Sequence, residues 1–179
     1  KNWELVLHVD ENTGASDLSM DVTNPNVLYA AFWQHRRYPW KVESGGPGSA
    51  LWKSTDGGET WFKIQNGLPN ELGKMGISVS KANSEKVYAL VESDTEKEQG
   101  GLFVSNDGGD NWNRVSKDHR LISRAWYYIE VFADPVEENT VYVLGAAGLK
   151  SADGGKTWTN LSGTHGDYHQ LWINKSDNQ

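Results

Sequence analysis

Hydrophobic and polar residues alternate along this chain in short runs, which are bounded by Gly, Pro, Asn and Asp. Such period-two alternation predicts β-strands that bury one face. The runs form three consecutive sets of four. The first strands lie at 17–22, 74–80 and 126–134, the second at 27–29, 86–88 and 140–142, the third at 50–54, 101–105 and 148–151, and the fourth at 61–65, 112–115 and 158–161. The pattern therefore predicts an all-β protein built from four-stranded antiparallel units.

One string, S-x-D-G-G-x-x-W, separates the third and fourth strands of every set. It occupies residues 54–61, 105–112 and 151–158, so that its copies begin 51 and then 46 residues apart. This interval is typical of one four-stranded unit per copy, as in the blades of a β-propeller. We call these three segments the DGG turns.

The residue types of the DGG turns suit a tight connection between strands. Glycine reaches positive φ without steric cost, and a short Asp or Ser side chain can satisfy nearby amides. The Trp then offers a large apolar face for packing. A catalytic role is the other interpretation of the repeated Asp, but a catalytic group is rarely needed three times. We therefore expect a structural role for Ser54, Asp56, Gly58, Trp61, Ser105, Asp107, Gly109, Trp112, Ser151, Asp153, Gly155 and Trp158.

The DGG turns resemble the Asp-box, or bacterial-neuraminidase (BNR), repeats of sialidases, xyloglucan-cleaving hydrolases and sortilin-like receptors. Four further segments extend the resemblance over essentially the whole chain: residues 13–17, 36–40, 44–48 and 165–169. With them, the chain looks most like large bacterial sortilin-like or "glycosyl hydrolase" BNR-repeat proteins. It is more distantly similar to xyloglucan hydrolases and sialidases. The resemblance implies a β-propeller that is secreted, periplasmic or held at the cell surface.

The boundaries predict one partial propeller over residues 1–179. Three blades are expected at 17–65, 74–116 and 126–162. Residues 1–7 align with the outer strand of a preceding blade, and 168–174 with the inner strand of a following one. Closed propellers have roughly four to eight blades. We therefore expect an open fragment completed by the remaining blades of a longer parent chain or, alternatively, by another copy.

The amino-acid composition argues against several classes of binding partner and site. A net charge of −7 argues against binding to nucleic acid, whose phosphates require a basic surface. No apolar run approaches the roughly 20 residues of a membrane span. The absence of cysteine excludes disulfides and thiolate metal sites.

Alternate connections of an antiparallel blade emerge on opposite faces. The DGG turns share one face. The second-to-third connections and the links between blades share the other, which we call the loop face. Basic side chains gather in or beside its connections: His8, His35, His119, His165, His169, Arg36, Arg37, Arg120 and Arg124. The sequence therefore predicts a ligand site on the loop face.

The segment 165–169 is the sharpest local candidate. In an extended segment His165, Asp167 and His169 point the same way, so they can converge on a metal ion or form an acid/base pair. A structural role, in which the histidines hydrogen-bond the loop, is the alternative. No other cofactor is expected.

Two further segments combine Arg with aromatic rings. His35, Arg36, Arg37, Tyr38 and Trp40 fall in the longest variable loop and suit stacking on sugars and pairing with carboxylates. The alternative is a loop that packs its own Trp. Arg124 and Trp126 enter a predicted first strand, where their region either lines the channel or packs between blades. Arg120 completes the predicted ligand-binding set.

These observations support two functional hypotheses. The first is a secreted propeller that binds a glycan or a peptide on the loop face. The alternative is a glycoside hydrolase, which requires two carboxyl groups. Asp167 is the candidate for one of them, and Asp10, Glu11, Asp17 or Glu43 for the other. A sialidase is disfavoured, because no three arginines fall at blade intervals to hold a carboxylate.

Overall fold

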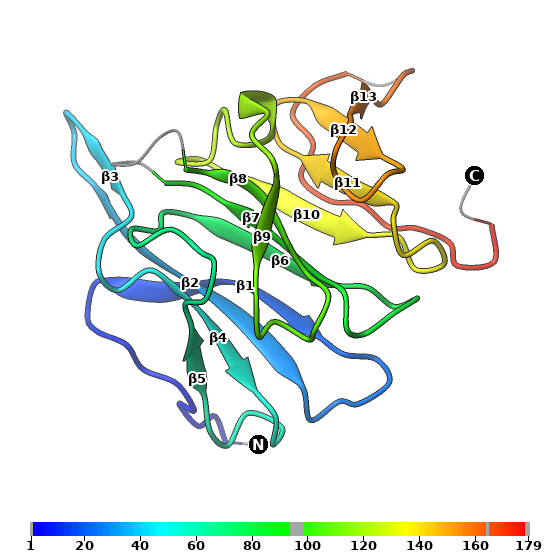
Figure 1. The fold of residues 1–179 in the computed structure, drawn as a ribbon. Helices are drawn as coiled ribbons and strands as arrows, with labels where there is room; N and C mark the ends of the chain where they lie inside the picture. Colours follow the sequence, from blue (N-terminus) through cyan, green and yellow to red (C-terminus); the bar gives the residue numbers. More distant parts are fainter. Residues whose placement is uncertain (1, 94–98, 164, 178–179) are drawn as a thin grey trace.

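Strands dominate the computed structural model, which describes residues 2–93, 99–163 and 165–177. They form three antiparallel sheets that follow one another along the chain (Figure 1). The described residues contain one short 3₁₀-helix, η1 (His119–Leu121), and no α-helix. No helix among them is long and apolar enough to cross a bilayer. The predicted all-β class is confirmed.

Each sheet keeps its strands in chain order, so every blade is a simple up-and-down meander. Blade 1 contains β1 (Thr13–Met20), β2 (Leu28–Arg37), β4 (Ala50–Ser54) and β5 (Phe62–Ile64), and β3 (Val42–Ser44) pairs with the end of β2. Blade 2 contains β6 (Met75–Val79), β7 (Val87–Val91), β8 (Gly101–Ser105) and β9 (Asn113–Ser116). Blade 3 contains β10 (Glu130–Ala133), β11 (Val141–Leu144), β12 (Gly148–Ser151) and β13 (Thr159–Asn160).

The three DGG turns share one hydrogen-bond pattern. In the first, the Ser54 hydroxyl donates to Asp56 at 2.7 Å and accepts from the Gly58 amide at 2.9 Å. Asp56 also accepts from the Thr60 amide at 2.9 Å, and the Trp61 indole donates to the Gly58 carbonyl. The other two turns repeat these bonds. Each turn is thus closed by its own side chains.

Two hydrophobic clusters join the blades in sequence. The first combines Tyr29 and Leu51 of blade 1 with Ile77 and Trp112 of blade 2. The second joins blade 2 to blade 3 and contains, among others, Tyr88, Leu90, Leu102, Val131, Val141 and Leu149. Adjacent blades therefore share a core, as in a propeller.

The inner strands β1, β6 and β10 protect one another's edges. The Asp17 carboxylate accepts from the Ile77 amide at 2.8 Å, and the Ser19 hydroxyl accepts from the Val79 amide at 3.0 Å. Ser78 of β6 does the same for the Ala133 amide of β10. Polar side chains thus replace the hydrogen bonds that an exposed strand edge lacks.

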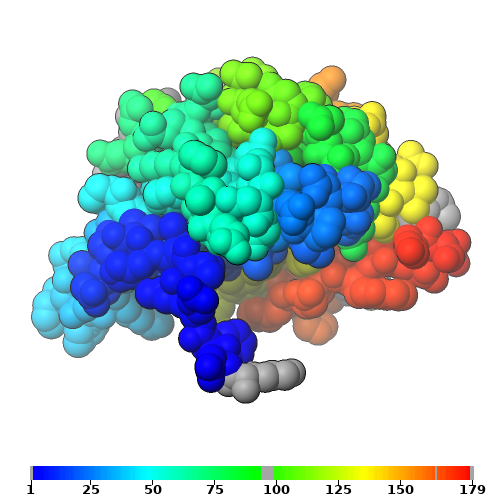
Figure 2. Space-filling model, turned by 90° about the horizontal axis from the view of Figure 1, so that it is seen from below, coloured from blue at the N-terminus to red at the C-terminus, as the bar shows by residue number. Residues whose placement is uncertain are grey.

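The two expected flanking strands are absent among the described residues. Residues 2–7 and 168–174 have no strand pairing, because no neighbouring strand in the chain bonds to them. Residues 2–10 instead extend from the body (blue in Figure 2), with the Trp3 side chain fully exposed. The strands that would pair with residues 1–7 and 168–174 would belong to adjacent blades, so the expectation of strands there stays a prediction.

Two other boundaries differ from the sequence prediction. The inner strand of blade 3 begins at Glu130 rather than at Trp126, since 122–127 form turns after η1. β2 continues to Arg37, because β3 pairs with its end. His35, Arg36 and Arg37 are therefore strand residues rather than loop residues.

Candidate functional site

The β2–β3 hairpin is a prominent feature of the loop face (cyan in Figure 1). Arg36 lies opposite Glu43 in its register, and the Tyr38 amide closes the tip by donating to the Lys41 carbonyl at 2.8 Å. The rings of Tyr38 and Trp40 stack at 5.6 Å. Trp40 is 76% exposed, so its outer face is open to solvent.

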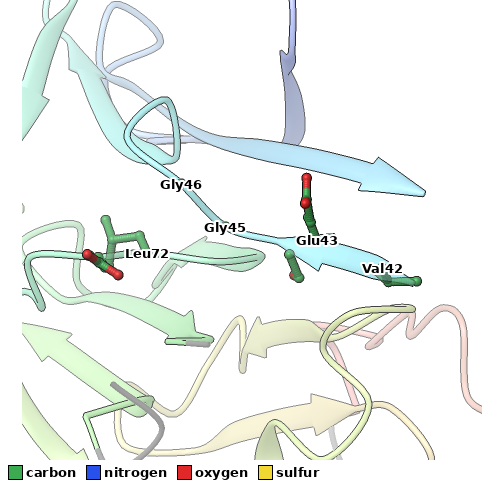
Figure 3. Close-up of a pocket in the computed structure, with 7 residues that line it drawn as sticks. Val42, Glu43, Gly45, Gly46 and Leu72 are labelled. Atoms are coloured by element: carbon green, nitrogen blue, oxygen red, sulfur yellow. The ribbon is translucent and has the colours of Figure 1, made fainter. Parts of the chain in front are cut away.

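Two hollows flank this hairpin. One, of about 350 Å³, is lined by Asn12, Gln34, His35, Arg36, Tyr38, Glu43 and Gly45. The other, of about 260 Å³, is lined by Val42, Glu43, Ser44, Gly45, Gly46, Glu71 and Leu72. Figure 3 shows Val42 and Glu43 on β3 and Leu72 on the facing segment. The hollows share Glu43 and Gly45, so they lie next to each other.

A buried network fixes the base of the hairpin. The Ser44 hydroxyl accepts from the Trp33 indole at 3.0 Å and donates to the Glu92 carboxylate. Glu92 also accepts from the Lys74 amide at 2.8 Å, and the Lys74 ammonium lies over the Trp33 ring. Blade 2 therefore anchors the hairpin of blade 1.

His35 packs its ring against Trp33, with 4.1 Å between ring centroids. Burial lowers the pKa of His35, and the charges of Arg37 and Lys74 lower it further. The imidazole is consequently neutral near pH 7 and offers one donor and one acceptor.

Two carboxyl groups on the inner strands have raised pKa values. Burial raises the pKa of Asp17 on β1, against the opposing effect of hydrogen bonds from the Ile77 and Leu18 amides. Burial also raises the pKa of Glu130 on β10, and the negative charge of Asp17 raises it further. Lys74, directly before β6, acts on both in the opposite direction. Three successive inner strands thus place Asp17, Lys74 and Glu130 within range of one another's charges.

Tyr128 organises the segment 165–169. Its hydroxyl lies 2.9 Å from the Gly145 carbonyl and 2.9 Å from the Asp167 carboxylate. The His169 ring stacks on the Tyr128 ring at 4.3 Å, and Arg124 lies 3.4 Å from Asp167. Asp167 has a φ of 71°, the only positive value of a non-glycine residue in the described segments.

Arg124 also connects this segment to exposed rings. Its guanidinium lies 5.3 Å from the Tyr127 ring and 6.0 Å from the Trp126 ring. Trp126 and Tyr127 are about half exposed. The structure thus brings together four predicted site residues: Arg124, Trp126, Asp167 and His169.

The predicted metal cluster is not assembled. The His165 ring lies 2.7 Å from its neighbouring Gly166 carbonyl, and His169 stacks on Tyr128. No group of three or more His, Asp or Glu side chains in the described part of the chain could hold a metal ion. A metal at His165, Asp167 and His169 is therefore not supported.

Several other predicted residues have local roles. The Arg120 guanidinium forms a hydrogen-bonded salt bridge with the Asp118 carboxylate at the start of η1. Asp10 accepts from the Asn12 amide and the Thr13 hydroxyl. Glu11 faces His8 at 3.7 Å, and Glu43 pairs with Lys41. Among the described residues, Asp167 bonds to Arg124, Tyr128 and Ala146, and none of these contacts links it to Asp10, Glu11, Asp17 or Glu43.

Sequence reasoning missed Glu130 and Lys74. A signal for Glu130 was present, since it is a charged residue within a predicted first strand, as Asp17 is. The electrostatic effects of Asp17 and Lys74 on Glu130 could not be predicted from the sequence, because they depend on how neighbouring inner strands align in space.

Comparisons with known proteins identify the architecture. No family model matches the chain. The structure superposes on a GH74 enzyme of Niastella koreensis with a TM-score of 0.58 and 23% identity, over 84% of this chain and 23% of that one. It also matches YCF48 bound to a D1 peptide, with a TM-score of 0.58 and 15% identity, over 89% of this chain and 45% of that one. The chain forms part of a β-propeller.

Sequence similarity adds relatives with assigned activities. The chain is 32% identical over 162 residues to a probable oligoxyloglucan-reducing end-specific xyloglucanase of Neosartorya fischeri, a match that covers 86% of this chain and 18% of that protein. It is 33% identical over 101 residues to a xyloglucanase of Paenibacillus sp., covering 56% and 9% respectively. The matches thus span less than a fifth of the length of these two relatives.

Proposed function

We propose that this propeller fragment belongs to a glycoside hydrolase that cleaves a polysaccharide near its inner strands. The observation that carries the proposal is the carboxyl pair Asp17 and Glu130, both with raised pKa values, on inner strands of blades 1 and 3. The similarity to xyloglucanases supports the same activity. This hydrolase hypothesis now has more support than binding without cleavage.

The environments of the two carboxyl groups suit opposite roles. Glu130 keeps its proton to a higher pH, because burial and the Asp17 charge both disfavour its ionised form. It is therefore our general acid, which protonates the leaving oxygen of the scissile bond. Asp17 accepts two backbone N–H bonds, which favour its charged form and oppose the effect of burial that raises its pKa. It is our candidate base or nucleophile.

The exposed aromatic rings would hold the sugar chain. Trp40 at the hairpin and Trp126 beside Tyr127 offer apolar surface on which pyranose rings can pack. Asp167, our initial catalytic candidate, would position Tyr128 and Arg124 rather than transfer a proton.

Other features of the intact protein are also proposed. Its remaining blades would come from a longer parent chain or from another copy. The resemblance to Asp-box and sortilin-like proteins and the xyloglucanase relatives are consistent with secretion or display at the cell surface.

Kinetics on the intact polypeptide that carries these residues test the activity. With xyloglucan as the probe, Glu130→Gln and Asp17→Asn should each lower kcat by about 100-fold or more, which is typical of losing an acid or base. The exposed Glu59→Gln variant is the matched control and should keep full activity. Thermal melting should accompany each assay, because Asp17 also accepts from the Ile77 amide.

Full activity of a folded Glu130→Gln variant would overturn the assignment. No release of reducing sugar from any polysaccharide by the wild-type protein, together with measurable glycan binding, would replace the hydrolase hypothesis with binding alone.

A further inference from the structure

The β2–β3 hairpin has two chemically different faces. Side chains alternate along a strand, so Gln34, Arg36 and Tyr38 point to one side and His35 and Arg37 to the other. The two arginines differ accordingly: Arg36 lines the 350 Å³ hollow and Arg37 does not. Adjacent arginines therefore have different surroundings.

The hollow has the size and polarity of a site for one small polar group. Its volume is within the range of about 300–1,000 Å³ found for small-molecule sites. Its lining offers amides from Asn12 and Gln34 and a carboxylate from Glu43. These groups can donate to and accept from hydroxyls.

The charges around the hollow are not balanced. Lys41 pairs with Glu43, whereas Arg36 forms no ion pair in the described ranges. The Arg36 guanidinium lies 5.6 Å from the Tyr38 ring, which orients it beside the hollow. A neutral sugar does not require this cation. In a chain with a net charge of −7, one oriented guanidinium beside an open hollow favours an anionic group.

We infer that this hollow binds a carboxylated sugar, such as a uronic acid residue, of the polysaccharide substrate. Arg36 would pair with the sugar carboxylate, Asn12 and Glu43 would bond its hydroxyls, and the exposed Trp40 would pack against a neighbouring ring. The inference rests on the proposed function, because it names the substrate class of that hydrolase. It separates this chain from enzymes that act on neutral xyloglucan alone.

The geometry favours a sugar over an acidic peptide. A peptide with several carboxylates would gain from cations spread along its length, whereas the hollow has one unpaired guanidinium beside a stacked aromatic pair. A single carboxylate on a ring that packs against Trp40 satisfies both features.

Binding measurements by isothermal titration calorimetry can test the inference without relying on cleavage. The intact protein is titrated with a tetragalacturonate, with a neutral xyloglucan heptasaccharide and with a ten-residue Glu-rich peptide. Arg36→Ala should weaken tetragalacturonate binding about 10- to 100-fold, as expected for a hydrogen bond to a charged group. Its effect on the neutral oligosaccharide should be less than about twofold. The sequence also predicted Arg37 as a ligand residue, but Arg37 does not line the hollow and is withdrawn from the binding set. Arg37→Ala is therefore the matched control and should bind tetragalacturonate as the wild type does.

The outcomes separate this inference from the hydrolase proposal. If the neutral oligosaccharide binds and tetragalacturonate does not, the uronic acid site is wrong while the hydrolase stands. Equal losses in the Arg36 and Arg37 variants, or tighter binding of the acidic peptide, would also overturn it. If no glycan binds, both proposals fail.

Discussion

The Tyr29 hydroxyl of blade 1 donates a 2.6 Å hydrogen bond to the Gly108 carbonyl in the DGG turn of blade 2. The corresponding tyrosine of blade 2, Tyr88, donates to the Glu138 carbonyl of blade 3 at 2.7 Å. Both side chains are buried. Second-strand tyrosines of blades 1 and 2 therefore link each of these blades to a turn of the next.

Removing this link should loosen the contact between blades 1 and 2. We expect Tyr29→Phe to lower the free energy of unfolding by about 0.5–1.5 kcal/mol, the usual net value of one hydrogen bond. Urea denaturation measures the change. Tyr127→Phe is the control, since its ring is half exposed and no hydrogen bond of its hydroxyl occurs in the described structure. Equal losses in the two variants would contradict a specific link.

Adding a methyl group at a glycine of a DGG turn also tests the contact between blades 1 and 2. Gly58 and Gly109 both have positive φ, 96° and 89°. A Cβ on Gly109 would lie 2.8 Å from a ring carbon of Tyr29, whereas a Cβ on Gly58 would meet nothing closer than 3.5 Å. Gly58→Ala should cost about 1 kcal/mol from backbone strain alone.

Gly109→Ala should lower the free energy of unfolding by about 1–3 kcal/mol more than Gly58→Ala does, because the blades must separate to admit the methyl group. Urea denaturation of the two variants provides the comparison. Equal destabilisation would mean that strain, rather than the contact between blades, dominates at Gly109.

Much of the scaffold was predictable from the sequence because its determinants are local. The predicted third strands, 50–54, 101–105 and 148–151, coincide with β4, β8 and β12. Each is fixed by the DGG turn that follows it within a few residues. The short strand β3 was missed, because Val42–Ser44 is brief and pairs with the charged end of β2.

The candidate site was less predictable because it combines distant segments. Arg36 and Trp40 were recognised from residue type, but the hollow beside them also requires Asn12 and Gly45. The coupling of Asp17 to Glu130 depends on three inner strands lying side by side. Conversely, local spacing in residues 165–169 suggested a metal cluster that the fold does not assemble.

The DGG turns should make stability depend on acid. Hydrogen bonds from Thr60 and Ser54 lower the pKa of Asp56 to about 2, and bonds from Ser105 and Asn111 lower that of Asp107 to about 2. These groups stabilise the fold while ionised, so their contribution is present above pH 4 and is lost as the pH falls toward 2. Thermal melting between pH 5 and 2 should show a fall in Tm that is smaller in Asp56→Asn. An identical fall in that variant would exclude Asp56 as a cause.

The inner-strand pair should show the opposite dependence. Burial and the Asp17 charge raise the pKa of Glu130, so the folded state favours its protonated form. This contribution is present at low pH and is lost as the pH rises through the raised pKa. Glu130→Gln cannot ionise, so relative to wild type it should gain stability as the pH rises from 4 to 7. Urea denaturation at both pH values measures this difference, and a difference that does not change with pH would contradict the raised pKa of Glu130.

Tyr128 should hold the segment that contains Asp167 against blade 3. Its hydroxyl bridges the Gly145 carbonyl and the Asp167 carboxylate, and the Tyr168 amide donates to the same Gly145 carbonyl at 3.1 Å. Tyr128→Phe removes the bridge but keeps the ring that stacks on His169. We expect faster hydrogen exchange at the amides of Asp167 and Tyr168, with little change in global Tm, because local opening costs less than unfolding. The amides of β6 serve as the internal reference. Unchanged exchange at Asp167 and Tyr168 would show that the backbone bonds to Gly145 and Ala146 hold this segment without Tyr128.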